Sequence, residues 1–170
     1  MTLPARRQPA QSVSFAATAE AHLDDVYGYL VYLTRDRSLA EDLAAETFEK
    51  ALKLWRRFDP RRASARTWLC QIARTTALDW FRAEERRHRR EHAVAVPDVS
   101  PGDMPQGLSP ELEAALAGLS AAEREVIALR ILLELDGDEA ARVLGISATA
   151  VSTRLSRALK KLEERMTVHV

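Results

Sequence analysis

Residues 93–110 divide the chain into two parts, because no regular helix can run through them. The stretch reads AVAVPDVSPGDMPQGLSP and holds four prolines and two glycines without helical periodicity. Proline ends helices, and clusters of proline, glycine, serine and aspartate are typical of linkers. We therefore expect an N-terminal domain over residues 14–92, a flexible linker over 93–108 and a C-terminal domain over 109–166.

Both parts have the pattern of α-helices. Apolar residues make up 46% of the 170 residues, which is enough for a core, and there are only 6 glycines and 7 prolines. Alanine, leucine, glutamate and arginine dominate, and all four favour helix. Alternating apolar and polar runs are absent, so the sequence predicts an all-α protein made of two small helical domains.

The N-terminal part predicts three helices. In the first, an apolar stripe is formed by Leu23, Val26, Tyr27, Leu30 and Leu33. The second is expected to begin at Ser38, with Glu41 completing a capping box. Pro60 ends that helix, and Ser64 is expected to cap a long third helix from residue 65 to about 90. Trp68, Trp80 and Cys70 are assigned to its buried side.

The C-terminal part predicts a helix-turn-helix. Ser120 and Glu123 form a capping box, and Asp136 can cap a short helix that ends at Gly145. Ser147 can then cap a second helix. Two helices joined by a short glycine turn are typical of helix-turn-helix proteins, in which the second helix enters the major groove of DNA.

The zero net charge conceals two basic blocks. Residues 50–90 carry thirteen basic and four acidic residues, a net charge of +9, and residues 141–170 carry six and two, a net charge of +4. The segments 20–49 and 91–140 are acidic, at −6 and −9. Basic blocks on separate domains indicate one nucleic acid that is held at two places.

Other classes of protein receive no support from the sequence. One cysteine, Cys70, forms neither an intrachain disulfide nor a cysteine zinc site, which suits the cytoplasm. No apolar run approaches the length of a membrane span, and no export signal begins the chain. His88 and His92 stand four residues apart, but they lack further ligands. We therefore expect no enzyme, no cofactor, no metal and no small-molecule substrate.

Three runs resemble one family closely, the bacterial RNA polymerase sigma factors of the extracytoplasmic-function (ECF) group. They are AEDLAAETFEKA at 40–51, RTWLCQIARTTALDWFR at 66–82, and LSAAEREVIALRILLEL at 119–135 followed by LGISATAVSTRLSRALKKL at 144–162. The resemblance implies promoter-specific transcription initiation with core RNA polymerase, in which the first domain is region 2 and the second is region 4.

In region 2, the resemblance implies two surfaces. One docks on the clamp helices of the polymerase through Asp42, Ala45, Glu46 and Glu49. The other captures a flipped base of the minus-ten element and helps to open the duplex, a step that costs a few kcal/mol of stacking. Its residues are Arg61, Arg62, Ser64 and Arg66 in the loop, and Arg74, Thr75, Asp79, Arg82, Arg86 and Arg87 along the helix.

In region 4, the resemblance implies recognition of the minus-thirty-five element and contact with the polymerase flap. The residues for DNA are Ser147, Thr149, Ser152, Thr153, Arg154, Arg157 and Lys160. Arginine can bind guanine through two hydrogen bonds, and serine and threonine can contact bases or phosphates. The family also implies a separate anti-sigma protein as a further partner.

Four positions depart from the family pattern. Ala45 stands where glutamine is common, Thr75 where asparagine is usual, Ala150 where threonine is frequent and Ser152 where lysine is frequent. Two other functions therefore stay open. One is a sigma-like decoy that binds an anti-sigma protein but no promoter, and the other is a stand-alone helix-turn-helix regulator.

Overall fold

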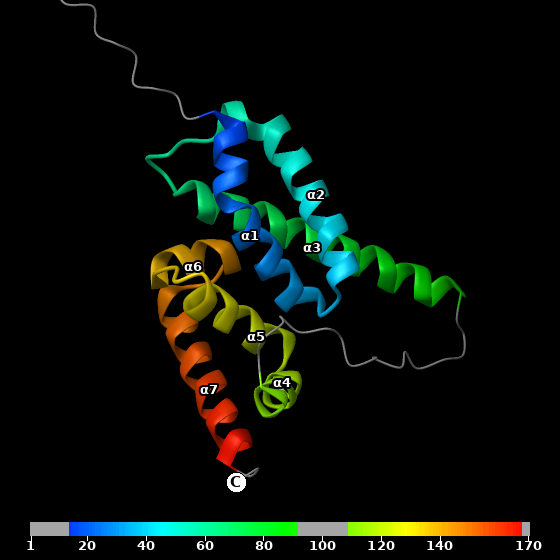
Figure 1. Cartoon of the computed structure of the whole chain (residues 1–170), viewed down its shortest axis with the longest axis vertical. Helices are drawn as coiled ribbons and strands as arrows, with labels where there is room; N and C mark the ends of the chain where they lie inside the picture. The colour runs from blue at the N-terminus through cyan, green and yellow to red at the C-terminus, as the bar shows by residue number, and fades with distance from the viewer. Residues whose placement is uncertain (1–13, 92–108, 168–170) are drawn as a thin grey trace, which may run out of the picture.

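Two groups of helices pack against each other in the computed structural model, which describes residues 14–91 and 109–167 (Figure 1). Within those ranges there is no β-strand, as the all-α prediction requires. The elements of the first group are α1 (Phe15–Thr34), α2 (Arg37–Leu54), the 3₁₀ turn η1 (Trp55–Arg57) and α3 (Ala65–Glu91). Those of the second are α4 (Pro110–Ala117), α5 (Ala121–Ile127), the π-helical turn η2 (Ala128–Leu132), α6 (Gly137–Leu144) and α7 (Ala148–Thr167).

The first group is a three-helix bundle with one apolar centre. Tyr29 and Leu30 of α1, Leu43 of α2 and Leu69 of α3 are at most 1% exposed. Aromatic rings close one end of the bundle, where the Trp55 and Phe58 rings stack with centroids 5.1 Å apart and Trp68 packs against both. This arrangement fixes the loop between η1 and α3 on a rigid base.

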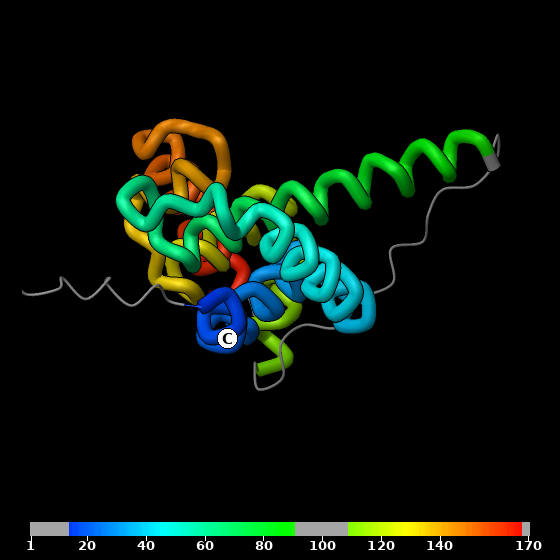
Figure 2. The backbone as a smooth tube through the Cα atoms, turned by 90° about the horizontal axis from the view of Figure 1, so that it is seen from above, coloured from blue at the N-terminus to red at the C-terminus, as the bar shows by residue number. Residues whose placement is uncertain are grey.

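Helix α3 is much longer than its packing partners. It contains 27 residues and is therefore about 40 Å long. Its first half packs on α1, α2 and α6, while its second half extends away from the rest of the molecule (Figure 2). The five arginines from residue 82 to residue 90 are all exposed on this extension.

The second group is a series of short capped helices. Ser109, Ser120, Asp136 and Ser147 each accept a backbone N–H three residues later. Capping boxes are complete at Ser120 with Glu123 and at Asp136 with Glu139. Gly145 has φ +66°, which favours glycine, and it ends α6 before the turn into α7. The predicted helix-turn-helix is therefore present as α6 and α7.

Two local predictions were wrong. Helix α2 begins two residues earlier than predicted, because Asp36 and not Ser38 is its N-cap; Asp36 Oδ1 accepts the Leu39 N–H at 3.0 Å. Leu23 was expected inside, but it is 50% exposed, while Tyr29, Val31 and Tyr32 are buried. The reason is that α1 contacts α2 and α3 on one side and α5 on another, so its buried surface is wider than one stripe.

Cys70 is a core side chain, as predicted. It is fully buried, and burial raises the pKa of its thiol to about 12, so the thiol stays protonated and unreactive. Among the described helices none has the length and apolarity needed to cross a membrane. The predicted linker 93–108 and His92 lie outside the described residues.

The two competing N-caps of α2 can be separated by mutation. Asp36→Ala removes the acceptor for the Leu39 N–H and is expected to lower the free energy of unfolding by about 1 kcal/mol. Ser38→Ala, inside the helix, is expected to leave it nearly unchanged. Urea unfolding monitored by circular dichroism measures both. A larger loss of unfolding free energy for Ser38→Ala would show that Ser38, and not Asp36, caps α2.

Candidate nucleic-acid and partner-binding surfaces

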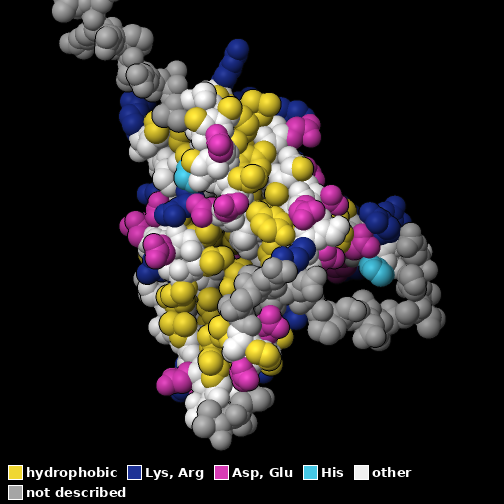
Figure 3. Space-filling view, in the orientation of Figure 1, with side chains coloured by type: hydrophobic (Ala, Val, Ile, Leu, Met, Phe, Trp, Pro, Cys, Tyr) yellow, Lys and Arg dark blue, Asp and Glu magenta, His cyan; other side chains and the backbone are white. Residues whose placement is uncertain are grey.

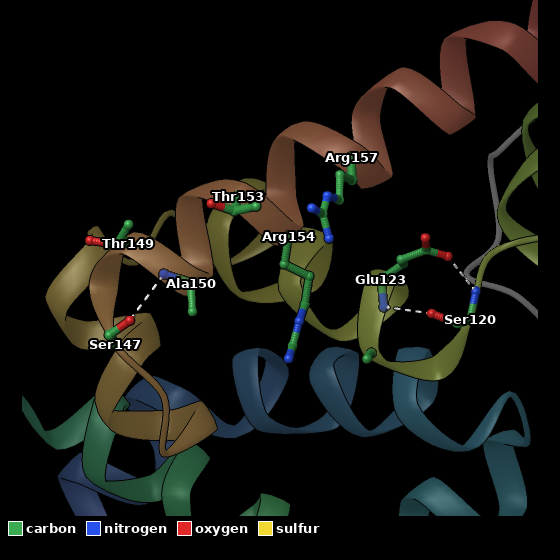
Figure 4. A pocket seen from close by; sticks show the side chains of 9 residues that line it. Ser120, Glu123, Ser147, Thr149, Ala150, Thr153, Arg154 and Arg157 are labelled. Carbon is green, nitrogen blue, oxygen red and sulfur yellow. Dashed lines mark hydrogen bonds between the residues drawn. The ribbon is translucent and has the colours of Figure 1, made fainter.

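One open groove gathers most of the residues that were predicted to read the minus-thirty-five element. It has a volume of about 540 Å³ and lies along the start of α7, facing α5. The predicted residues that line it are Ser147, Thr149, Thr153, Arg154 and Arg157. Arg154 and Arg157 extend from α7 into the groove (Figure 4). Ser152 and Lys160 are exposed on α7 but are not part of its lining.

Local chemistry explains why this groove suits an anion. The Ser147 hydroxyl accepts the Ala150 N–H at 3.1 Å and so starts α7 at a defined residue. The N-terminus of a helix carries a partial positive charge, and Thr149 and Thr153 add hydroxyl groups on the first turns. The guanidinium groups of Arg154 and Arg157 follow further along α7. The groove can therefore hold a phosphate backbone at its start and present arginine to base edges.

A single carboxylate, that of Glu123, lies in the same groove. Its Oε2 accepts the Ser120 N–H at 2.7 Å, and its Oε1 lies 3.0 Å from Lys161 Nζ. The backbone hydrogen bond from Ser120 and the Lys161 ammonium lower the pKa of Glu123. The carboxylate is thus ionised at neutral pH, but it is matched by Lys161 rather than by Arg154 or Arg157.

Of the four residues predicted to capture a base, Arg61, Arg62 and Ser64 lie in the loop between η1 and α3, and Arg66 lies in the first turn of α3. The Arg61 side chain is 89% exposed, and its Nε donates to Asp59 Oδ1 at 3.1 Å. This contact raises the pKa of Arg61 and lowers that of Asp59. Arg62 is exposed, and Arg66 lies 4.0 Å from Asp25 of α1. Ser64 caps α3 by accepting the Thr67 N–H at 3.1 Å.

The remaining predicted minus-ten residues do not share one face of α3. Thr75 and Asp79 line a groove between α2 and α3, together with Lys50, Trp68 and Ile72. Arg82, Arg86 and Arg87 are exposed on the extension, where basic side chains gather (Figure 3). Asp79 pairs with Arg82 at 3.5 Å, and Glu84 pairs with Arg87 at 2.9 Å.

Arg74, predicted to bind the minus-ten element, is instead largely covered by the second helical group. Its side chain is only 25% exposed, because it faces α5 of the second group. There its Nε donates to Glu125 Oε1 at 2.7 Å. Sequence periodicity could not reveal this partner, since the two residues belong to different domains.

The face of α2 predicted to dock on the polymerase is fully accessible. Asp42, Ala45, Glu46 and Glu49 are all exposed, on the side opposite the buried Leu43 and Thr47. Glu46 pairs with Lys50 at 2.7 Å, and Glu49 pairs with Lys53 at 2.6 Å. Exposed ion pairs of this kind contribute little to stability, so these carboxylates can exchange partners at low cost.

Sequence reasoning missed the residues that join the two helical groups. They are Tyr29, Thr67, Gln71, Glu125 and Glu139. One signal was present, since Glu125 directly precedes the stretch VIALRILL, which is apolar except for Arg130. Among the described residues no group of three metal-ligating side chains comes together.

Comparisons with known proteins cover both helical groups. The family model described as Sigma-70 region 2 matches residues 18–87, and that described as Sigma-70, region 4 matches residues 109–162. The ECF RNA polymerase sigma factor SigX of Bacillus subtilis is 31% identical over 165 residues, which cover 90% of this chain and 84% of SigX. The ECF RNA polymerase sigma factor SigC of Mycobacterium tuberculosis is 34% identical over 145 residues, covering 84% of this chain and 77% of SigC.

A solved structure is also similar over most of the chain. It is the sigma factor RpoE of Bartonella quintana in complex with the anti-sigma factor NepR. The match has a TM-score of 0.78 at 25% identity and covers 91% of this chain and 97% of the solved one.

The Glu123 cap in the groove predicts a pH dependence of stability. Because its pKa is lowered in the folded chain, Glu123 contributes stability that is present above its ordinary pKa of 4.5 and is lost as the pH falls through the folded value. Glu123→Gln keeps a capping oxygen but not the charge. The variant is expected to be less stable than the wild type at pH 7, and the difference is expected to vanish in acid. Urea midpoints between pH 7 and pH 3 measure it, and a constant difference would contradict the assignment.

Proposed function

The chain belongs to the ECF group of the sigma-70 family of RNA polymerase sigma factors, and on that premise we propose that it binds core RNA polymerase and directs promoter-specific initiation. One observation carries the DNA-binding part: five predicted residues converge on the groove at the start of α7. The polymerase supplies the chemistry, so no catalytic activity is assigned to this chain. Its place of action is the cytoplasm, where the polymerase is.

Each surface takes one part of this function. We propose that the exposed acids of α2, Asp42, Glu46 and Glu49, face the polymerase clamp, with Ala45 between them. The groove on α7 reads the minus-thirty-five element. The arginine loop at 61–66 and the exposed residues Thr75, Asp79, Arg82, Arg86 and Arg87 hold the minus-ten strand. Arg74 joins them once it is released from Glu125.

A separate anti-sigma protein is the proposed regulator. The similar RpoE structure is described as a complex with an anti-sigma factor. The decoy function has no specific observation in its favour, because both DNA surfaces keep exposed arginines.

The role of the loop can be tested by transcription in vitro. Core polymerase, a promoter library and the wild-type chain are expected to give transcripts from a shared two-element motif. Changing Arg61, Arg62 and Arg66 together to alanine is expected to lower initiation at least about tenfold, since each phosphate contact that is lost weakens binding. The matched control changes Arg56, Arg57 and Arg142, three exposed arginines outside the proposed site, and is expected to stay near wild type.

Other outcomes of that experiment point to the alternatives. A chain that binds core polymerase but starts no transcript is a decoy. A chain that binds one duplex sequence tightly without core polymerase is a stand-alone regulator. If the loop variant and its control lose transcription initiation equally, the loop is not part of the DNA-binding site.

The groove on α7 makes a sequence-specific prediction. Arg157→Ala is expected to cost about 1–3 kcal/mol, or about 5- to 150-fold, in preference for an intact over a scrambled minus-thirty-five element, because a base contact is lost. Arg142→Ala, which removes the same charge from the exposed side of α6, is expected to leave the preference unchanged. Competition between two promoters for the same holoenzyme measures both. If Arg157→Ala weakens binding to both promoters equally, the side chain contacts only the backbone.

A further inference from the structure

A second cavity opens where the turn between α1 and α2 faces the start of α5 (Figure 1). It has a volume of about 630 Å³, and its apolar wall includes Leu33 of α1 and Leu78 and Phe81 of α3. Cavities of this size with apolar walls and a few polar groups are typical of sites for small molecules. None of the residues that line it is among those assigned to DNA or to the polymerase.

Two arginines line this cavity, and part of each guanidinium group lacks a hydrogen-bond partner. The Nε atoms of Arg35 and Arg124 are buried, and neither donates to any of the described residues. Arg124 Nη1 donates to the Leu119 carbonyl, which holds that guanidinium group in place. A buried donor without an acceptor costs free energy, so its presence in a folded chain indicates the place of a water, an ion or a ligand.

The two guanidinium groups also repel each other. Burial and the positive charge of Arg35 lower the pKa of Arg124. Glu123 acts in the opposite direction, but its carboxylate is engaged by Lys161 at 3.0 Å. Arginine stays charged in proteins, so the cavity holds two positive charges close together. An anion between them would reduce this repulsion.

Two acids border the same cavity, but neither supplies that anion. Asp36 directs Oδ1 to the backbone at the start of α2, and the Glu125 Oε1 accepts from donors of α1 and α3. Within the described part of the chain, neither acid forms an ion pair with Arg35 or Arg124. The arginines therefore keep their binding capacity for a molecule from outside the chain.

The backbone at Arg35 points in the same direction. Its φ of 55° and ψ of 27° lie in the left-handed region, where glycine is favoured and other residues cost free energy. The buried Nε of this arginine makes no hydrogen bond that would offset the cost within the fold. Conformations of this kind are concentrated at functional sites. Binding a ligand gives the arginine at this position a use.

We propose that this cavity is a binding site for a small phosphate monoester with an apolar or aromatic body. Arg35 and Arg124 bind the phosphate oxygens through their unpartnered Nε groups, and Leu33, Leu78 and Phe81 cover the body. The charges match, because a phosphate monoester carries about −1.5 to −2 at neutral pH and the site carries two guanidinium groups. The site requires neither polymerase nor promoter, so it does not depend on the proposed function.

Calorimetric titration of the full chain with naphthyl phosphate tests the site. We expect a dissociation constant below about 1 mM. Inorganic phosphate and naphthol each provide half of the contacts and are expected to bind at least about tenfold more weakly. Naphthoate, with a single negative charge, is also expected to bind more weakly. If naphthyl phosphate does not bind, or if naphthoate binds as tightly, the phosphate site is wrong.

Arg35→Gly removes one guanidinium group without straining the turn. Because glycine adopts a φ of 55° at no cost, circular dichroism is expected to show a melting temperature close to or above that of the wild type. The affinity for naphthyl phosphate is expected to fall at least about tenfold, since a charged hydrogen bond is lost. A folded variant that binds as tightly as the wild type would overturn the inference.

Two control variants separate the site from general effects. Glu134→Gly makes the same backbone change at a φ of 51° outside the cavity. Arg57→Ala removes one positive charge from an exposed position. Both are expected to bind naphthyl phosphate like the wild type. Losses equal to that of Arg35→Gly would mean that the probe binds by charge alone, against the inference.

Methyl NMR of the full chain locates the probe. We expect naphthyl phosphate to shift the methyl signals of Leu33 and Leu78, which line the cavity. Shifts confined to Thr149 and Thr153 would place the probe in the groove on α7 and would contradict the proposed site.

A synthetic peptide of residues 93–108 tests whether a protein segment is the occupant instead. It carries Asp98 and Asp103 among apolar residues. We expect it to bind more weakly than naphthyl phosphate. If the peptide binds in a manner that Arg35→Gly abolishes while naphthyl phosphate does not bind, the cavity takes a protein segment and the small-molecule site is wrong.

Discussion

The carboxylate of Glu125 is the point on which the observed arrangement of the two helical groups depends. A negative charge at 6% exposure is tolerated only if donors surround it, and here they come from Arg74 and Tyr29 on two other helices. Satisfying this one group ties α5 to α1 and α3, in addition to the apolar core that the two helical groups share. Through the short chain from α5 to α7, it also fixes where the groove of the second group faces.

Local chemistry made much of the fold predictable. The caps at Ser64, Ser120, Asp136 and Ser147 form the hydrogen bonds that their sequence contexts indicate. The error at α2 arose because Asp36 and Ser38 are both good caps, and only the turn at Arg35, with φ 55°, selects the first. Periodicity also misplaced Leu23, since a helix that is covered on two sides has no single apolar stripe.

The candidate sites were predictable where they follow one helix and unpredictable where they cross domains. Five residues of the α7 groove could be named because they recur on one side of a capped helix. Arg74 could be named as basic, but no pattern in its own helix indicates that Glu125 lies 51 positions away in sequence and 2.7 Å away in space. Long-range partners of this kind depend on how whole helices pack, which a residue-by-residue pattern does not encode.

In the second half of α3, the residues proposed to bind DNA are separate from the residues that stabilise the fold. Its arginines are exposed, and Glu84 and Glu85 form ion pairs with Arg87 and Arg89 along the same helix. Substitutions there leave the packed bundle intact, whereas changes at Leu69 or Ala73 would disturb it. Substitutions during evolution can therefore change which DNA sequence this part of α3 binds without destabilising the fold.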